Sequence, residues 1–433
     1  MGEGTLSDKR RIVISGMAIN TKLGDDINTF YENLMAGKSG VTNWKCIDTS
    51  GIYSKVGGDL SDYDIKGKAK ELGEKLPEGW GKRLRKIIRK APFATALSVL
   101  CAVDAYISSG LVDTDFDHTR FAVIVSGHNL NKLYQHNNFI QFQEEPDYVD
   151  SMAAFLSLDT DHAGSVAEIL EAKGPIYTMG GACASANIAL RNAVDELLYH
   201  GNEVAMVVGA PLEFAPMDLH AMALMGAITF QNFHDTPHLA SRPYDADREG
   251  FIPSHGAGVL VLETLEHAKA RGAHIYAEIM GVQAMSDACH LPSPSVEGQS
   301  RTMSRLMEKT GIPPEEIDYI SAHATSTPLG DLTELRSIKQ AFGDQAYKLK
   351  INAPKSMLGH TCWSAPAVET IAAVMQMNNG WLHPSINIDN LDPEVDVDVC
   401  ANEPVQYEVR TMLKNSFGFG GINCCSIIRK YEE

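Results

Sequence analysis

A cysteine lies where an extended segment of the chain gives way to a helical one. Residues 174–186 read GPIYTMGGACASA, so two glycines precede Cys183, and a run with helical spacing of apolar residues, 185–200, follows it. This order places Cys183 at a helix N-terminus, where free backbone N–H groups and the macrodipole favour the reactive thiolate. The segment predicts a nucleophile, although a small residue packed into a tight turn explains it equally well.

Two histidines follow strand-like segments in the second part of the chain. His323 lies in SAHATSTPLGD (321–331), and His360 ends KSMLGH, in which Lys355 stands five residues before it. An imidazole can donate or accept a proton near neutral pH, so both are candidate acid–base groups. Since the chain contains 15 histidines, either one alone is more often only a hydrogen-bonding residue.

A glycine-rich loop near the C-terminus is the fourth candidate. Residues 415–423 read NSFGFGGIN, and the glycines permit unusual backbone angles and close approach of the backbone to a ligand. The four segments therefore follow one another along the chain in the order cysteine, histidine, lysine with histidine, and glycine loop.

Short apolar β-type segments alternate with longer helical patterns along the chain. This alternation predicts a layered α/β fold in which helices cover the strands. One large unit built from two halves accommodates the 433 residues. The predicted strands are 11–15, 121–126, 204–208, 259–262, 275–279, 319–321 and 425–428, and the predicted helices are 87–109, 185–200 and 366–377.

The composition excludes several classes of protein. With 44% hydrophobic and 21% charged residues, the chain is neither disordered nor a coiled coil. A net charge of −18 argues against non-specific binding of nucleic acid. Eight cysteines without a CxxC pair predict neither a disulfide scaffold nor a metal site. The N-terminal segment is not an apolar signal, and no apolar stretch is long enough for a membrane span, so we predict a cytoplasmic protein that does not bind membranes.

Together, the four segments resemble the active-site motifs of the β-ketoacyl synthase (elongating ketosynthase) family, in the same order. The similarity continues through RIVISG (11–16), FYENLMAGKSG (30–40) and SRPYDADREGF (241–251), and it covers nearly the whole chain. The resemblance implies a thiolase-like α/β fold with two similar halves, 1–265 and 266–433, in a five-layered αβαβα core. It also implies a homodimer, with the nucleophile in the first half and both histidines in the second.

The activity that the resemblance implies is a decarboxylative Claisen condensation. Cys183 would accept an acyl group from the phosphopantetheine of an acyl carrier protein, and His323 and His360 would hold the malonyl thioester as CO₂ leaves. The backbone N–H groups of Cys183 and Phe419 would form a second oxyanion hole. No enzyme-bound cofactor is implied, because the acyl groups arrive on the carrier protein. Further roles fall to Lys355 and its partner Glu369 in ordering the histidines, to Thr325, Thr327 and Gly420 in binding substrate, and to Phe419 as a gate.

A basic segment stands out in this acidic chain. Residues 82–90 read KRLRKIIRK, and on a helix Lys82, Arg85, Lys86 and Arg89 would share one face. Similar family members dock the acidic carrier protein at a basic surface in this region, so the face is a candidate docking site. A merely solvated helix face is the alternative.

Several segments depart from the usual family pattern. Ser254 and His255 stand where glycine and an acidic residue are usual, TCWSAP (361–366) replaces a small, glycine-rich stretch, and Ala324 replaces glycine. The lead into the cysteine block, around Met179, also differs. These changes surround the expected site and favour a specialised polyketide-pathway member over a housekeeping fatty-acid elongase.

Two other functions are compatible with the same motifs. A ketosynthase-like malonyl-carrier decarboxylase of a polyketide β-branching cassette needs both histidines but commonly lacks the cysteine, so Cys183 favours condensation. A subunit resembling a chain-length factor would shape the product without turnover, and such subunits typically lack the nucleophile. Acyl chain length, starter unit and pathway product are outside what the sequence decides.

Overall fold

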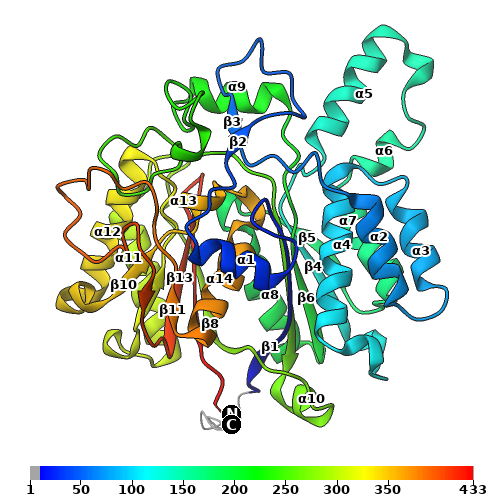
Figure 1. The fold of residues 1–433 in the computed structure, drawn as a ribbon. Helices are drawn as coiled ribbons and strands as arrows, with labels where there is room; N and C mark the ends of the chain where they lie inside the picture. Colours follow the sequence, from blue (N-terminus) through cyan, green and yellow to red (C-terminus); the bar gives the residue numbers. More distant parts are fainter. Residues whose placement is uncertain (1–9, 433) are drawn as a thin grey trace.

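A ten-stranded sheet runs through the molecule (Figure 1), in a computed structural model that describes residues 10–432. The strands lie in the order β10-β9-β13-β14-β8-β1-β7-β6-β4-β5. The first half contributes β1 (Ile12–Asn20), β4 (Phe121–Ser126), β5 (Ile176–Met179), β6 (Val204–Gly209) and β7 (Ala257–Thr264). The second half contributes β8 (Ala277–Ser286), β9 (Tyr319–Ser321), β10 (Lys350–Asn352), β13 (Thr411–Gly418) and β14 (Ile422–Arg429).

The two halves of the sheet repeat one topology. In the first half, β4 is parallel to β5 and β6, whereas β7 is antiparallel to β6 and β1. In the second half, β9 is parallel to β10 and β13, and β14 is antiparallel to β13 and β8. Antiparallel pairing of β1 with β8 joins the halves. This duplication agrees with the two similar halves that the sequence predicts, while the exact division at 265/266 stays a prediction.

Helices form three layers around the two half-sheets. Between the half-sheets lie α8 (Ser185–Tyr199) and α14 (Ala365–Asn379), whose side chains join both halves in one apolar cluster. Outside the first half lie α2 (Ile65–Glu74), α3 (Trp80–Ile88), α4 (Phe93–Ser108) and α7 (Thr160–Leu170), and outside the second lie α11 (Val296–Thr310) and α12 (Pro328–Phe342). The expected αβαβα layering is therefore confirmed.

The central helix α14 is buried around nearly its whole circumference. Its residues from Ala365 to Met377 are all buried, and many of them are small or β-branched. A helix that is apolar on every side must lie inside a protein, because no face of it gains from contact with water. Small side chains also let the sheet approach closely, since a Cβ on Gly258 of β7 would lie 2.9 Å from the Val368 nitrogen. The helix that carries Glu369 is thus held rigidly between the half-sheets.

One predicted helix, 87–109, is wrong because the segment forms two helices. Helix α3 ends at Ile88, within the basic segment, and α4 begins at Phe93. Pro92 caps α4 and has no N–H to continue a helix, and it restricts the preceding residue to extended conformations. The predicted strands 121–126 and 319–321 are confirmed at both ends, as β4 and β9. The other predicted strands and helices are present with shifted ends; β1, for example, extends to Asn20 and β8 to Ser286.

The remaining elements complete the molecule, and one of them, α13 (Lys355–Leu358), is buried within it. Helix α5 projects from it as an arm that returns through α6 (Figure 1). No helix within residues 10–432 has both the length and the apolar character needed to cross a bilayer. The other helices are α1 (Ile27–Met35), α5 (Lys132–Glu144), α6 (Ala153–Leu156), α9 (Pro216–Leu224), α10 (Leu265–Ala270) and α13 (Lys355–Leu358), and the short strands are β2 (Thr42–Asn43), β3 (Val56–Gly57), β11 (Trp381–Leu382) and β12 (Val405–Gln406).

Candidate active site

Cys183 lies in a tight corner between β5 and α8. The corner is a single 3-10 turn, Ala182–Ala184, in which Ala182 has a left-handed φ of 46°. The Ser185 hydroxyl accepts from the Gly181 N–H (2.9 Å) and donates to the Ala182 carbonyl (2.6 Å), which fixes the corner. The predicted strand-to-helix position of Cys183 is therefore confirmed. The side chain is 6% exposed, so it is accessible only from a cavity.

The matching corner of the second half carries His360. After β10 and α13, a 3-10 turn at Cys362–Ser364 leads into α14, and Cys362 has a φ of 53°. The Cys362 N–H donates to His360 Nδ1 (3.2 Å), whereas His360 Nε2 is buried and has no hydrogen-bond partner among residues 10–432. Because Nδ1 accepts, the proton of the neutral ring lies on Nε2. His360 thus presents an unpaired N–H donor to the cavity that it lines.

His323 is fixed from behind by two charged side chains. Its backbone N–H and that of Ala324 donate to the Glu334 carboxylate (2.9 and 2.7 Å), and its carbonyl accepts from Lys355 Nζ (2.5 Å). Lys355 Nζ also lies 3.4 Å from His323 Nδ1, which places the ring proton on Nε2. The His323 and His360 rings are packed edge to face, and their centroids lie 5.4 Å apart.

A buried charge network lies beneath the two histidines. Lys355 forms an ion pair with Glu369, the partner that the sequence predicts. On its other side, Glu369 Oε2 lies 2.7 Å from Nζ of Lys414, a residue of β13. Sequence reasoning did not identify Glu334 or Lys414. The sequence does contain a signal for Lys414, however, since it is the one charged residue in a strand whose other members are uncharged.

Burial dominates the protonation of the reactive groups. It lowers the pKa of His323 and of His360 well below the usual value, and the ammonium of Lys355 lowers both further. Burial also raises the pKa of the Cys183 thiol to about 12. Lys355 opposes this rise, as do the backbone N–H groups of Cys183 and Phe419, which face the sulfur. The expectation that the helix N-terminus makes Cys183 a thiolate is therefore wrong for the resting site, because desolvation outweighs it.

One cavity of about 390 Å³ contains these groups. Cys183, His323 and His360 line its inner part, and exposed side chains such as Leu291 and Leu329 line its mouth. The remaining lining includes Thr325, Thr327, Phe419, Asp287 and Asn423.

The glycine of the β13–β14 turn that approaches the cysteine corner is Gly418. A Cβ added there would lie 2.6 Å from the Gly181 carbonyl oxygen and 3.2 Å from the Cys183 nitrogen. Gly420, which the sequence nominates for substrate binding, does not line the cavity and has open space around it. Gly418 is therefore the glycine at which this loop comes close to the backbone of the cysteine corner.

The departures from the family pattern have visible structural consequences. Ala324 has a φ of 24°, a region that glycine occupies without strain, and its N–H is held by Glu334. Trp363 stacks on His128 with ring centroids 4.6 Å apart and donates to the His128 carbonyl. The Ser254 N–H donates to the His360 carbonyl (3.0 Å). Ala324 lines the cavity, whereas Trp363 and Ser254 support the surrounding backbone without lining it.

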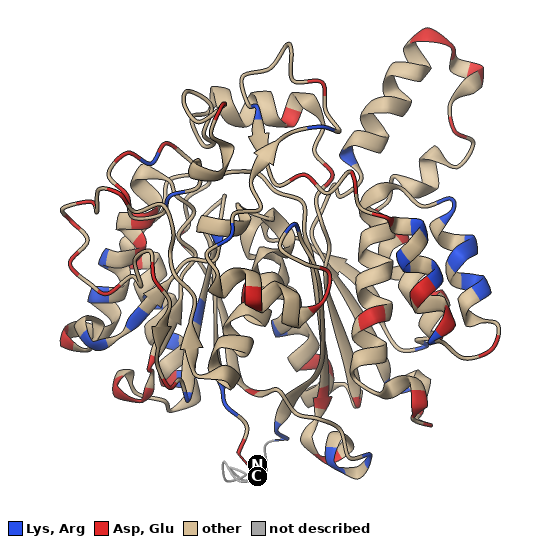
Figure 2. Ribbon diagram, in the orientation of Figure 1, with Lys and Arg blue, Asp and Glu red and all other residues tan. Residues whose placement is uncertain are grey.

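The basic face predicted at 82–90 is present. Lys82, Arg85 and Lys86 are exposed on α3, and exposed Arg89 follows at its C-terminus. None of the four forms an ion pair with any residue that the structure describes. Figure 2 shows this basic helix at the outer side of the first half, away from α12 at the opposite side.

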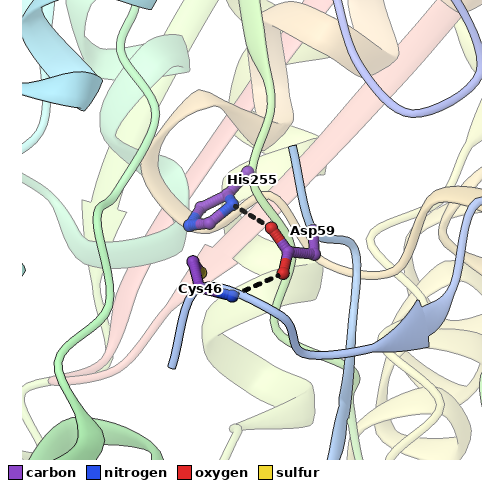
Figure 3. Close-up of side chains that lie close together, drawn as sticks. All are labelled: Cys46, Asp59 and His255. Carbon is purple, nitrogen blue, oxygen red and sulfur yellow. Dashed lines mark hydrogen bonds and ion pairs between the residues drawn. The ribbon is translucent and has the colours of Figure 1, made fainter. Parts of the chain in front are cut away.

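Three side chains of metal-binding types lie together near Ser254. Figure 3 shows Cys46, Asp59 and His255, whose possible ligand atoms lie within 4.8 Å of one another. Asp59 already accepts from the Cys46 N–H (3.1 Å), and His255 Nδ1 accepts from the Leu60 N–H (3.3 Å). Burial lowers the pKa of His255 to about 4, so the ring is neutral. Because the Asp59 carboxylate and His255 Nδ1 already have protein partners, we assign the cluster a role in closing the loop.

A protonated resting thiol predicts a specific pH dependence. Because only the thiolate is alkylated and its pKa is about 12, the rate of Cys183 modification should rise about tenfold per pH unit between pH 7 and 9. Lys355→Met should slow the reaction, since it removes the first cation that opposes burial. The measurement is iodoacetamide labelling followed by peptide mass mapping, with exposed Cys289 as the internal control. A rate plateau below pH 9 would contradict the assignment.

Comparison with known proteins identifies the family. Residues 9–268 match the model of the β-ketoacyl synthase N-terminal domain, and residues 276–389 match that of its C-terminal domain. The chain is 33% identical over 432 residues to chloroplastic 3-oxoacyl-[acyl-carrier-protein] synthase I of Hordeum vulgare, covering 98% of this chain and 90% of that protein. It is 32% identical to 3-oxoacyl-[acyl-carrier-protein] synthase 2 of Staphylococcus aureus strain N315, covering 99% and 100%.

Solved structures show the same relationship. A β-ketoacyl synthase from Burkholderia phymatum superposes with a TM-score of 0.87 at 26% identity, covering 98% of this chain and all of that one. A ketosynthase bound to its type II polyketide synthase acyl-carrier protein and to a hexaketide superposes with a TM-score of 0.85 at 27% identity, over 98% and 100% of the chains. With both family models matched and the fold shared, this chain belongs to the β-ketoacyl synthase family.

Proposed function

We propose that this protein is a β-ketoacyl-[acyl-carrier-protein] synthase that condenses an acyl group on Cys183 with a malonyl unit on a carrier protein. The observation that carries the proposal is the convergence of one thiol and two neutral imidazoles in one cavity. The sequence relatives named 3-oxoacyl-[acyl-carrier-protein] synthases support it. The pathway is of fatty-acid or polyketide type.

The first step transfers the acyl group to the enzyme. The Cys183 sulfur loses its proton and attacks the thioester carbonyl of the acyl-carrier protein; the carrier thiol leaves and takes up a proton. The N–H groups of Cys183 and Phe419 face the sulfur, so they are placed to stabilise the negative oxygen that forms beside it. Buried Cys183 needs this help, because desolvation disfavours its own thiolate.

The second step releases CO₂ from the malonyl thioester. The thioester oxygen would accept from Nε2–H of His323 and of His360, both of which line the cavity. The bond to the carboxylate carbon breaks, its electron pair becomes the enolate, and CO₂ departs. A preorganised donor of this kind contributes roughly 3–4 kcal/mol to a transition state. Lys355 and Glu334 hold the His323 backbone in place for this task.

The third step forms the carbon–carbon bond. The enolate carbon attacks the acyl carbonyl on Cys183, the sulfur leaves, and it recovers a proton from solvent. We propose that Thr325 and Thr327, whose hydroxyls lie 3.1 Å apart in the cavity wall, contact the pantetheine arm, and that exposed Phe419 gates the cysteine. Contact of Gly420 with substrate stays a prediction, as do the absence of an enzyme-bound cofactor and the cytoplasmic location.

Substitution of the nucleophile tests condensation directly. Cys183→Ala should abolish the β-ketoacyl product from acyl- and malonyl-carrier protein, a loss of more than about 10³-fold, because no acyl-enzyme can form. Intact-mass analysis of carrier proteins and enzyme gives the products and the acylated cysteine. If wild type yields only acetyl-carrier protein, and Cys183→Ala yields equally much, the protein is a decarboxylase instead. Turnover that appears only after a second ketosynthase-like chain is added would indicate a non-catalytic subunit.

We also propose that the α3 face docks the acyl carrier protein. Four exposed basic side chains without acidic partners among the described residues form a local positive surface on a chain of net charge −18. Such a surface attracts an acidic partner and orients its approach. The solved complex of a related ketosynthase with its carrier protein supports a partner of this kind.

Charge reversal tests the docking face. Arg85→Glu with Lys86→Glu should raise KM for carrier-bound substrate about tenfold at low salt, with kcat unchanged. The reason is that electrostatic steering affects the association of the carrier protein with the enzyme and not the chemical steps. KM for a small soluble thioester should not change. The control is Lys269→Glu with Lys348→Glu, two exposed lysines elsewhere with the same charge change. Equal effects of the two double variants would show that net charge, not this face, governs binding.

We propose a homodimer formed along β5. This strand is the last of the sheet, and Ile176 on it is 41% exposed, so its edge is open to pairing with another strand. Exposed apolar residues continue from it onto the neighbouring arm; they are Phe139, Phe142, Tyr148 and Phe155. An apolar surface of this extent is typical of a protein interface.

Light scattering tests the dimer. Wild type should have twice the 47.2 kDa chain mass, and Ile176→Lys should shift it to the monomer, because the edge would then bury an unpaired charge. Trp381→Lys, which places a lysine on the exposed strand β11 of the second half, is the control and should stay dimeric. A wild-type monomer would contradict the proposal.

A further inference from the structure

A buried lysine of unassigned role lies under the candidate site. Lys414 of β13 has no exposed surface, although lysine is rarely buried unless it is paired. Its Nζ lies 2.7 Å from Glu369 Oε2 and 3.2 Å from the Ser416 hydroxyl, and it donates to the Asn415 carbonyl. Nothing about a sheet of this kind requires a charge at this position, and burying one is costly.

Lys414 changes the charge balance of the site. Glu369 is shared between Lys355 and Lys414, so two ammonium groups meet one carboxylate. The second carboxylate, Glu334, is already engaged by the backbone N–H groups of residues 323 and 324 and by the Asn415 amide. The titratable groups that face the histidine pair from the elements packed against it are Cys183, Glu334, Lys355, Cys362, Glu369 and Lys414.

We propose that Lys414 is a positioning residue whose charge, acting through Glu369 and Lys355, keeps His323 and His360 neutral, so that the enolate forms a carbon–carbon bond instead of taking up a proton. This inference rests on the proposed condensation. It concerns why the enolate formed by decarboxylation goes on to attack the acyl group on Cys183. Lys355 alone would form a neutral pair with Glu369. The second ammonium leaves the Lys–Glu–Lys group net positive.

The fate of the enolate depends on the acidity of the imidazole N–H that donates a hydrogen bond to it. A neutral imidazole N–H holds the enolate oxygen without releasing its proton. An imidazolium, with an ordinary pKa of about 6.5, can protonate the enolate carbon. That transfer converts the enolate to an acetyl thioester and the imidazolium to imidazole, which regains a proton from solvent. The acyl group on Cys183 is then left unreacted, and the malonyl unit is consumed without product.

The positions of the charges agree with this role. Besides burial and Lys355, the ammonium of Lys414 lowers the pKa of both histidines. Its ion pair also restrains Glu369 Oε2, which would otherwise be free to turn toward Lys355. Since the folded site disfavours the protonated imidazoles, removing one cation should raise their pKa, and the protonated fraction should then grow as the pH falls.

The experiment compares product partition across pH. Wild type and Lys414→Met are incubated with acyl- and malonyl-carrier protein at pH 5.5 to 8.0, and intact masses give the ratio of acetyl- to β-ketoacyl-carrier protein. The wild-type ratio should stay constant. For Lys414→Met it should rise as the pH falls from 8.0 to 5.5, and at pH 5.5 it should exceed the wild-type ratio about tenfold, because a rise of one pKa unit increases the protonated fraction of imidazole about tenfold at a given pH.

Controls separate charge from packing. Lys350→Met, a lysine substitution on β10, which is separated from β13 by β9 and lies outside the cavity lining, should behave as wild type. Lys414→Arg, which keeps the charge, should restore a constant ratio. A folded Lys414→Met with a ratio independent of pH overturns the inference. Failure of both Lys414→Met and Lys414→Gln to fold also overturns it, since the lysine is then structural. A wild type that forms no β-ketoacyl product refutes the condensation itself.

Discussion

The carboxylate of Glu369, held between Lys355 and Lys414, is the interaction on which the site depends. It ties the central helix α14 to α13 and to β13, and all three charged side chains are buried. Isolated charges in such a region are very costly, so each member is tolerated only while the others stay in place. Lys355 in turn holds both the carbonyl and the ring of His323. The orientation of the reactive imidazole of His323 is therefore set by an ion network that contacts it through Lys355.

The duplicated topology explains where the site lies. Each half supplies one corner at the same place in its strand order, and the corners at Cys183 and Cys362 meet across the two central helices. One corner presents a thiol, and the other fixes the tautomer of His360 through a backbone N–H. Neither half contains a complete site. The shared apolar cluster around α8 and α14 is thus a functional constraint as well as a source of stability.

The unusual residues around the site act on its supports and leave its reactive atoms unchanged. Ser254 and the residues beside it hold the His360 backbone, while His255 closes a loop with Asp59. Trp363 packs against His128 behind the cysteine corner. Such changes alter the rigidity and shape of the surroundings while the donors and the thiol keep their places.

The sequence by itself determined the layered α/β class, the two halves, the positions of Cys183, His323 and His360, and the pairing of Lys355 with Glu369. The periodicity of apolar residues and the short sequence motifs carry that information, because both depend only on neighbours along the chain. Only the tertiary structure decided that Pro92 divides the predicted helix, that Gly418 and not Gly420 approaches the cysteine, and that Lys414 joins the network. It also decided that Cys183 rests as a thiol. Each of these depends on burial and on contacts between segments far apart in the chain, and a residue's environment in three dimensions is not encoded in its sequence neighbours.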